Sequence, residues 1–218
     1  MSPTVDYSSW SPASTSSESN SGSPVHPASL VDPMSHSSAI LQLVDVQLTS
    51  SVIDYIVECI ADAVWHGLTR DLHHPSHIAP RTASLPIDEF TPFVRSVLSL
   101  AEVRPATVFV ALAYVARARR HLAIISPAWA LERIFLGALI AASKYTQDST
   151  LRNGQWARCS GVFGRRDVGR IEREFLEVLD WDLGVREEEI LVHWGAVMGL
   201  QDLELASVDA SRIGIQSA

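Results

Sequence analysis

Residues 134–145 read Ile-Phe-Leu-Gly-Ala-Leu-Ile-Ala-Ala-Ser-Lys-Tyr, and the first nine of them are apolar or small. A second run of nine such residues, 108–116, lies upstream. A helix that is apolar on every face has to be enclosed by other helices. The two runs therefore predict the centre of a helical bundle. Both are far shorter than the roughly 20 residues that a membrane-spanning helix needs, so we expect no membrane segment.

The first of these runs ends at Lys144, which is the only lysine of the chain beside sixteen arginines. A compact ammonium and a forked guanidinium are not interchangeable, so a single lysine suggests a site that requires the ammonium. Alternatively, the lysine stands there by chance and stabilises the C-terminus of a helix. The lone lysine by itself does not separate these two interpretations.

Further helices are predicted around the two runs, because apolar residues recur at three- and four-residue steps. Ser50 or Ser51 is the expected N-cap of the first helix. No stretch alternates with the period of a strand, so the predicted fold class is all-α. We expect five core helices plus flanking N- and C-terminal helices. The predicted helices span about 50–67, 90–102, 105–121, 128–145, 166–181 and 186–200, with a helical turn at 155–159.

The chain divides by composition into a tail, a domain and a second tail. Residues 1–38 contain fourteen serines and five prolines and few large apolar residues. Such a segment cannot bury enough apolar surface to offset the conformational entropy that it would lose on folding. We therefore expect a disordered tail over 1–49, a folded domain over 50–200 and a C-terminal tail over 201–218. Ser11 and Ser23 each precede a proline, and we expect them to accept phosphate from a proline-directed kinase.

Charge and cysteine content narrow the function classes. The net charge of −8 argues against a nucleic-acid binder that depends on overall basicity. The charge is uneven, because residues 152–170 hold five arginines and one acid, whereas 171–209 hold eleven acids and two arginines. Two cysteines form neither a disulfide framework nor a zinc signature. With no apolar leader at the N-terminus, we expect a soluble intracellular protein.

Catalytic motifs are absent from the sequence. Residues 161–164 contain two glycines but lack the Lys-Ser/Thr pair of a phosphate-binding loop, and no Gly-x-Ser-x-Gly elbow occurs. His73, His74 and His77 lie close together, but only Asp71 stands near them as a further metal ligand. We therefore expect a binding module with no catalytic residue, no metal and no cofactor.

Four stretches together resemble the cyclin box, and in particular the single-box, PCL-type (phosphate-pathway) cyclins of fungi. Residues 107–117 and 133–145 are similar to the second and third box helices, the latter ending in Ala-Ser-Lys. Residues 148–157 are similar to the linker of the PCL group, and 171–183 to the fifth helix and its exit. Gln147 departs from the pattern, because the PCL linker usually has Asn there.

The resemblance implies a binding site for a cyclin-dependent kinase. In the family, a lysine that ends the third helix pairs with a glutamate of the fifth, and these positions match Lys144 and Glu172. Around this pair the resemblance implies an apolar kinase-binding face formed by Phe135, Leu139 and Phe175, if these are exposed. The resemblance also assigns Asp148, Asn153 and Trp156 to the linker motif of the family. We expect Trp156 and Trp181 to be anchored in the core.

The implied function is that of a non-catalytic subunit that binds and activates a PCL-type partner kinase in cell-cycle, polarity or phosphate-response regulation. A kinase inhibitor and phosphorylation substrates would be further partners, and the expected location is nucleus and cytoplasm. Three alternatives remain: a cyclin that binds without activating, a small enzyme of unknown class, and a cyclin-fold adaptor in transcription. The adaptor would bind DNA or a polymerase through Arg117, Arg119, Arg120, Arg165 and Arg166.

Overall fold

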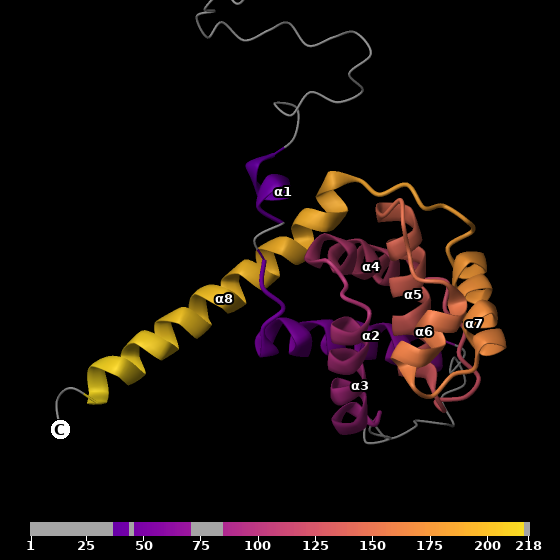
Figure 1. Cartoon of the computed structure of the whole chain (residues 1–218), viewed down its shortest axis with the longest axis horizontal. Helices are drawn as coiled ribbons and strands as arrows, with labels where there is room; N and C mark the ends of the chain where they lie inside the picture. Colours follow the sequence, from indigo (N-terminus) through magenta and orange to yellow (C-terminus); the bar gives the residue numbers. More distant parts are fainter. Residues whose placement is uncertain (1–36, 44–45, 71–84, 216–218) are drawn as a thin grey trace, which may run out of the picture. The chain divides into compact units, whose positions relative to one another are not determined.

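All regular structure in the described part of the chain is helical. The structure is a computed structural model that describes the backbone of residues 37–43, 46–70 and 85–215, and side chains as far as residue 201 except at 41. Figure 1 shows the helices, which confirm the predicted all-α class. They are α1 (Ser38–Gln42), α2 (Ser50–Thr69), α3 (Ile87–Leu100), α4 (Pro105–Ala118), α5 (Ala130–Thr146), α6 (Asn153–Ser160), α7 (Arg165–Val178) and α8 (Glu187–Ile215).

The two apolar runs form α4 and α5, which lie at the centre of the bundle. Every residue of α4 from 107 to 115 is buried, as is every residue of α5 from 135 to 143. Helix α4 packs against α2, α5 and α8, while α5 packs against α2, α3, α4 and α7. Enclosure by neighbours is what an all-round apolar helix requires. None of the helices in this part of the chain is long and apolar enough to cross a membrane.

Local sequence sets several helix ends. Pro105 is the first residue of α4, where its missing N–H leaves no intrahelical bond unmade. Gly161 ends α6 with a left-handed φ of 67°, a conformation that costs glycine little. The N-cap of α2 is Thr49, one position before the serines we expected, and its hydroxyl accepts the N–H of Val52 at 3.4 Å.

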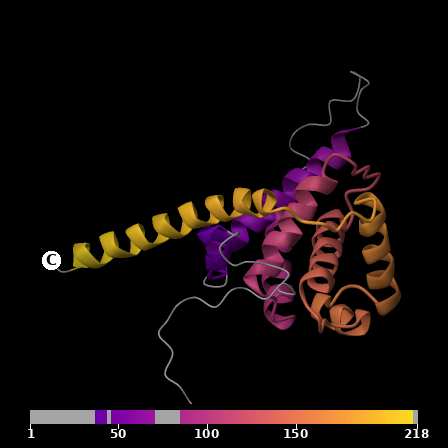
Figure 2. The ribbon, with the colours of Figure 1, turned by 90° about the horizontal axis from the view of Figure 1, so that it is seen from above.

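Helices α5 and α7 approach each other closely at a glycine. A Cβ atom added to Gly137 would lie 2.7 Å from Cβ of Phe175, well inside van der Waals contact. Phe175 itself is buried, so its ring covers the bare backbone of α5. Figure 2 shows the two helices side by side from above. Glycine at this position therefore sets the distance between the two helices that carry Lys144 and Glu172.

Helix α8 is longer than predicted. We expected it to end near residue 200 and a tail to follow, but it continues to Ile215. Neither Pro nor Gly occurs between residues 200 and 213, so nothing in the sequence stops the helix there. The helix packs against α1, α2 and α4. In that packing, the Tyr55 hydroxyl of α2 lies 2.8 Å from Nδ1 of the buried His193.

Candidate functional site

Lys144 and Glu172 form an ion pair across the α5–α7 contact. Nζ of Lys144, in the last turn of α5, lies 2.5 Å from Oε1 of Glu172 in α7. The lysine side chain is 40% exposed and the glutamate 13%. An ammonium has three donors, and the structure uses one of them for Glu172. The exposed lysine therefore presents unused donors at the surface, while its position is fixed by the glutamate.

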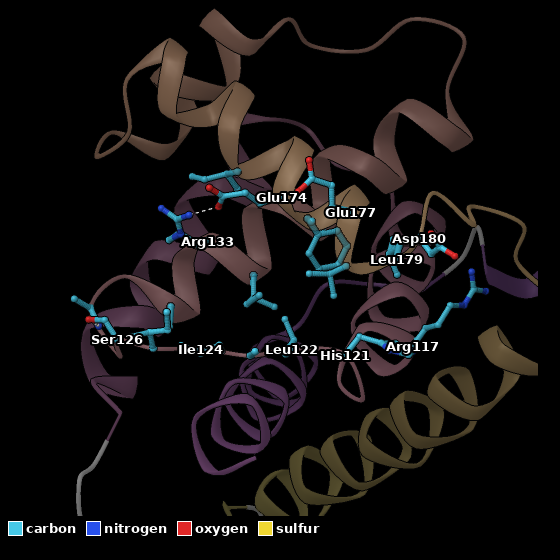
Figure 3. A pocket seen from close by; sticks show the side chains of 18 of the residues that line it. Arg117, His121, Leu122, Ile124, Ser126, Arg133, Glu174, Glu177, Leu179 and Asp180 are labelled. Atoms are coloured by element: carbon cyan, nitrogen blue, oxygen red, sulfur yellow. Dashed lines mark hydrogen bonds and ion pairs between the residues drawn. The ribbon is translucent and has the colours of Figure 1, made fainter. Parts of the chain in front are cut away.

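A second ion pair holds the same two helices on the other flank of α7. Arg133, in the first turn of α5, pairs with Glu174, as the dashed line in Figure 3 shows. Residues two apart on a helix leave it about 200° apart, so Glu172 and Glu174 lie on opposite flanks. Gly137 stands between Arg133 and Lys144 in the sequence of α5. The two pairs thus lie on opposite sides of the close contact between α5 and α7.

Two exposed aromatic side chains, Tyr145 and Trp181, lie near the C-terminal ends of α5 and α7. Tyr145 is 50% exposed and follows Lys144 directly, and its ring packs edge-on against that of Tyr114 at 6.3 Å. The Tyr114 hydroxyl donates to the carbonyl of Leu183 at 2.8 Å, and burial raises the pKa of this hydroxyl, so it stays protonated. This bond ties the turn after α7 to α4, through the same tyrosine that the Tyr145 ring packs against.

Our prediction that Trp181 is a core anchor is wrong, because its side chain is 60% exposed. Asp180 and Trp181 both adopt left-handed backbone angles, with φ of 52° and 59°. Two successive residues of this kind reverse the chain as α7 ends, and the indole turns out of the core. Trp156 is buried, as predicted for a core anchor.

Arg117 clamps the turn that carries Trp181. Its guanidinium donates to the carbonyls of Asp182 and Gly184 at 2.7 and 2.8 Å and to the Glu189 carboxylate at 2.9 Å. Burial by itself would raise the pKa of Glu189, but hydrogen bonds from the Arg186 backbone and from Arg117 outweigh it and lower that pKa. Arg117 therefore ties the turn to α4 and to the start of α8.

The arginine set of the adaptor alternative is not a free basic surface. Arg117 is engaged as described, and Arg119 pairs with Asp62 of α2 at 2.8 Å. Arg120, Arg165 and Arg166 are exposed, but they belong to two different parts of the chain. The structure thus corrects the expectation that Arg117 and Arg119 present their charge to a nucleic acid, because both already neutralise acids of this chain.

Three of the residues predicted to bind the kinase are core residues in this structure. Phe135, Leu139 and Phe175 are 3%, 0% and 2% exposed. Phe135 packs edge-on against Phe90 at 6.0 Å, and Phe175 covers Gly137. Phe135 of α5 thus faces α3, while Phe175 of α7 faces α5, and we correct the role of all three residues to packing in the core. Of the linker residues, Asp148 is exposed and Asn153 is half-buried beside Gly169.

Two hollows flank this region. The first lies between α7 and the loop that follows α4 (Figure 3). Its apolar lining includes Leu122, Ile124 and Leu179, and its acidic lining includes Glu177 and Asp180. The second shares Lys144 and is bordered by the turn before α4, the linker after α5 and the starts of α6 and α7. The described charged residues that line it are five cations and one acid, namely Arg104, Lys144, Arg152, Arg158, Arg165 and Glu102.

The remaining candidate residues are the metal ligands, the phosphorylation sites and the cysteines. Among the described residues, no group of three or more His, Cys, Asp and Glu side chains could hold a metal ion. The His73, His74 and His77 cluster and the predicted phosphorylation sites Ser11 and Ser23 lie outside the described residues. Cys59 and Cys159 are free thiols, and burial raises the pKa of each.

Sequence reasoning missed Tyr145, Trp181 and the basic hollow. An aromatic residue directly after Lys144 could have been read as exposed, because the apolar run ends there. The exposure of Trp181 depends on two successive left-handed residues, and neither of them is a glycine that would have indicated such a turn in the sequence. The basic hollow joins residues more than 60 positions apart, and no local pattern predicts such a meeting.

Comparison with known proteins assigns this fold and site to a class. The model of the cyclin N-terminal domain family matches residues 89–184, which run from α3 to the turn after α7. That span contains both members of the Lys144–Glu172 pair. The helical bundle therefore contains a cyclin box.

The similar curated proteins are PHO85 cyclins of Saccharomyces cerevisiae, and they support assignment to the PCL-type cyclins. PHO85 cyclin-2 is 28% identical over 163 residues, which are 72% of this chain and 50% of that protein. PHO85 cyclin-1 is 27% identical over 177 residues, 78% of this chain and 63% of that protein. PHO85 cyclin-9 is 42% identical over 60 residues, 27% of this chain and 20% of that protein. The chain thus matches between half and two thirds of the length of the first two.

Proposed function

We propose that the chain is a non-catalytic regulatory subunit that binds and activates a cyclin-dependent kinase of the PHO85 type. The observation that carries the proposal is the Lys144–Glu172 pair, held at the surface where α5 and α7 cross. The names of the similar proteins, PHO85 cyclins, support the same partner class.

The pair suits the binding of a helix end or a turn of the kinase backbone. The free donors of the Lys144 ammonium bond carbonyl oxygens, and the remaining lone pairs of Glu172 accept N–H groups. Because Glu172 is only 13% exposed, a partner that covers the pair removes little further water from the carboxylate. The pair therefore acts as a fixed two-sided polar contact, which gives orientation more than affinity.

Affinity comes from exposed aromatic side chains near the ends of α5 and α7. Tyr145 and Trp181 are half or more exposed, and both are residue types that dominate the energetics of interfaces. Each is held by a scaffold contact, Tyr145 by the Tyr114 ring and the Trp181 turn by Arg117. Rings held in place before binding lose little entropy when a partner covers them. We expect these two rings to be the hot spots of the interface.

Activation follows if the bound element is the regulatory αC helix of the kinase. Holding that helix inward places its glutamate against the lysine of strand β3, which is one of the parts that a protein kinase needs for phosphoryl transfer. The chain itself supplies no catalytic group in this account. Cell-cycle, polarity or phosphate-response control, and a location in nucleus and cytoplasm, belong to the same proposal.

The test is co-purification of the full chain with a PHO85-type kinase, followed by assay of kinase activity. Lys144→Glu reverses the exposed charge of the pair, and Arg133→Glu is the matched control, since it reverses the charge of the other α5–α7 pair. We expect Lys144→Glu to lose binding and activation, while Arg133→Glu retains both at equal helicity. Failure of the wild-type chain to bind would refute the proposal, and binding without activation would refute its second half.

A further inference from the structure

The hollow beside Lys144 contains a concentration of positive charge that the proposed kinase contact does not use. Arg104 precedes α4, Arg152 precedes α6, Arg158 lies in the last turn of α6 and Arg165 begins α7. All four line one cavity of about 1260 Å³. Among the residues that the structure describes, none of these guanidinium groups has a carboxylate partner, whereas Arg117, Arg119 and Arg133 all do. Among the described residues that line the cavity, Glu102 is the only acid.

The backbone adds donors to the same place. The first N–H groups of α6, at Asn153 and Gly154, have no acceptor within the helix, and both residues line the cavity. The Cδ atom of Arg165 lies 3.9 Å from the position of a Cβ on Gly154, so this arginine reaches the α6 N-terminus. Guanidinium forks and a helix N-terminus favour the same ligand, an anion with several oxygen acceptors.

The lining also restricts the chemistry of the anion. Amide and hydroxyl side chains complete the wall, among them Gln147, Ser149 and Thr150, and no aromatic ring of the described residues lines the cavity. Without a ring to stack on a base, the site lacks what single-stranded nucleic acids and nucleotides normally need. Four unpaired cations against one acid suit a dianion better than a carboxylate, and a phosphate monoester carries nearly two charges at neutral pH.

We propose that this cavity, lined by Arg104, Arg152, Arg158 and Arg165, binds a phosphorylated serine or threonine of a partner protein. Because the cavity shares Lys144 with the proposed kinase contact, a phosphorylated segment held there lies beside the kinase. A substrate already phosphorylated once is thereby retained for further phosphorylation. The binding step itself requires only this chain, so it stands or falls independently of kinase binding.

The test measures binding of a fluorescent ten-residue peptide with one phosphoserine-proline pair to the full chain, by anisotropy at low salt. Its unphosphorylated twin is the peptide control. Arg165→Ala removes a lining guanidinium, and Arg166→Ala is the matched control, because Arg166 is its exposed neighbour outside the cavity. Arg158→Ala is a second lining variant that does not depend on the start of α7.

We expect the phosphopeptide alone to bind, with an affinity that weakens as salt rises. Loss of one charge-assisted contact should weaken binding about tenfold in Arg165→Ala and Arg158→Ala, and by less than about twofold in Arg166→Ala. Equal binding of both peptides, or equal effects of Arg165→Ala and Arg166→Ala, would overturn the site. If inorganic phosphate binds as tightly as the peptide, the ligand is not a phosphorylated side chain of a protein, and the proposal is wrong. The same holds if a DNA duplex binds more tightly than the peptide and loses affinity in Arg165→Ala.

Discussion

Gly137→Ala tests whether the close approach of α5 and α7 controls the candidate site. The new Cβ would lie 2.7 Å from Cβ and 3.0 Å from Cγ of Phe175. Both atoms sit next to the backbone of α7, so a rotamer change of Phe175 cannot relieve the first contact. Carbon atoms pack at about 3.5–4.0 Å, so α7 has to move by about 1 Å.

Two opposing terms decide the sign of the stability change. Replacing glycine by alanine inside a helix stabilises by roughly 0.5–1 kcal/mol. Overpacking a tight core contact costs about 1–3 kcal/mol. We therefore expect a net loss of about 1–2 kcal/mol in unfolding free energy, which lowers Tm by roughly 2–8 °C for a domain of this size. The same shift of α7 carries Glu172 away from Lys144, so kinase binding should weaken as well.

Thermal unfolding followed by circular dichroism checks the prediction, with Gly195→Ala as the matched control. Gly195 is an exposed glycine of α8 whose added Cβ would meet nothing within 4 Å. The same chemical change there should raise Tm or leave it unchanged. If Gly137→Ala proves as stable as Gly195→Ala and binds the kinase normally, the close approach does not set the geometry of the pair, and our reasoning is wrong.

The remaining predictions concern the exposed Trp181, the hydrogen bonds of Arg117 and the buried His193. Trp181→Ala should weaken kinase binding about 30-fold, as truncation of an interface hot spot does. It should leave Tm within about 2 °C, because the indole is mostly exposed, and a large fall in Tm would contradict this prediction. Arg117→Lys should lower the unfolding free energy by about 1–3 kcal/mol, measured by urea denaturation, since an ammonium cannot reproduce the three-point contact with Asp182, Gly184 and Glu189. Burial lowers the pKa of His193 below the ordinary value of 6.5, so the unfolded chain takes up the proton first and stability falls as pH drops below about 6.5. His193→Gln should reduce this loss between about pH 7 and pH 5, and an unchanged pH profile of Tm would exclude the histidine as its cause.

The sequence was enough to predict the bundle because its strongest patterns are local. The apolar runs of α4 and α5 and the proline at the start of α4 each act within one helix, and the structure agrees with all of them. The partnership of Lys144 with Glu172 came from the family resemblance rather than from spacing, and the structure brings the two atoms together.

Features that depend on tertiary packing could not be predicted in this way. Phe135, Leu139 and Phe175 are apolar whether they face a partner or a neighbouring helix, and only the packing of the helices against one another decides that they are core. Trp181 is exposed because two non-glycine residues adopt left-handed angles, which the Arg117 clamp helps to hold. No periodicity in the sequence encodes either outcome.

The central claim is that Lys144 and Glu172 act as one unit in binding a kinase. The most direct test is the dissociation constant of the kinase complex for Lys144→Ala, Glu172→Ala and the double variant. A parallel cycle on Arg133 and Glu174 is the control. We predict that each single change on the first pair weakens binding about tenfold or more and that the double change adds little further, while the control cycle stays within about twofold. Full additivity of Lys144→Ala and Glu172→Ala, or equal effects in both cycles, would contradict the account.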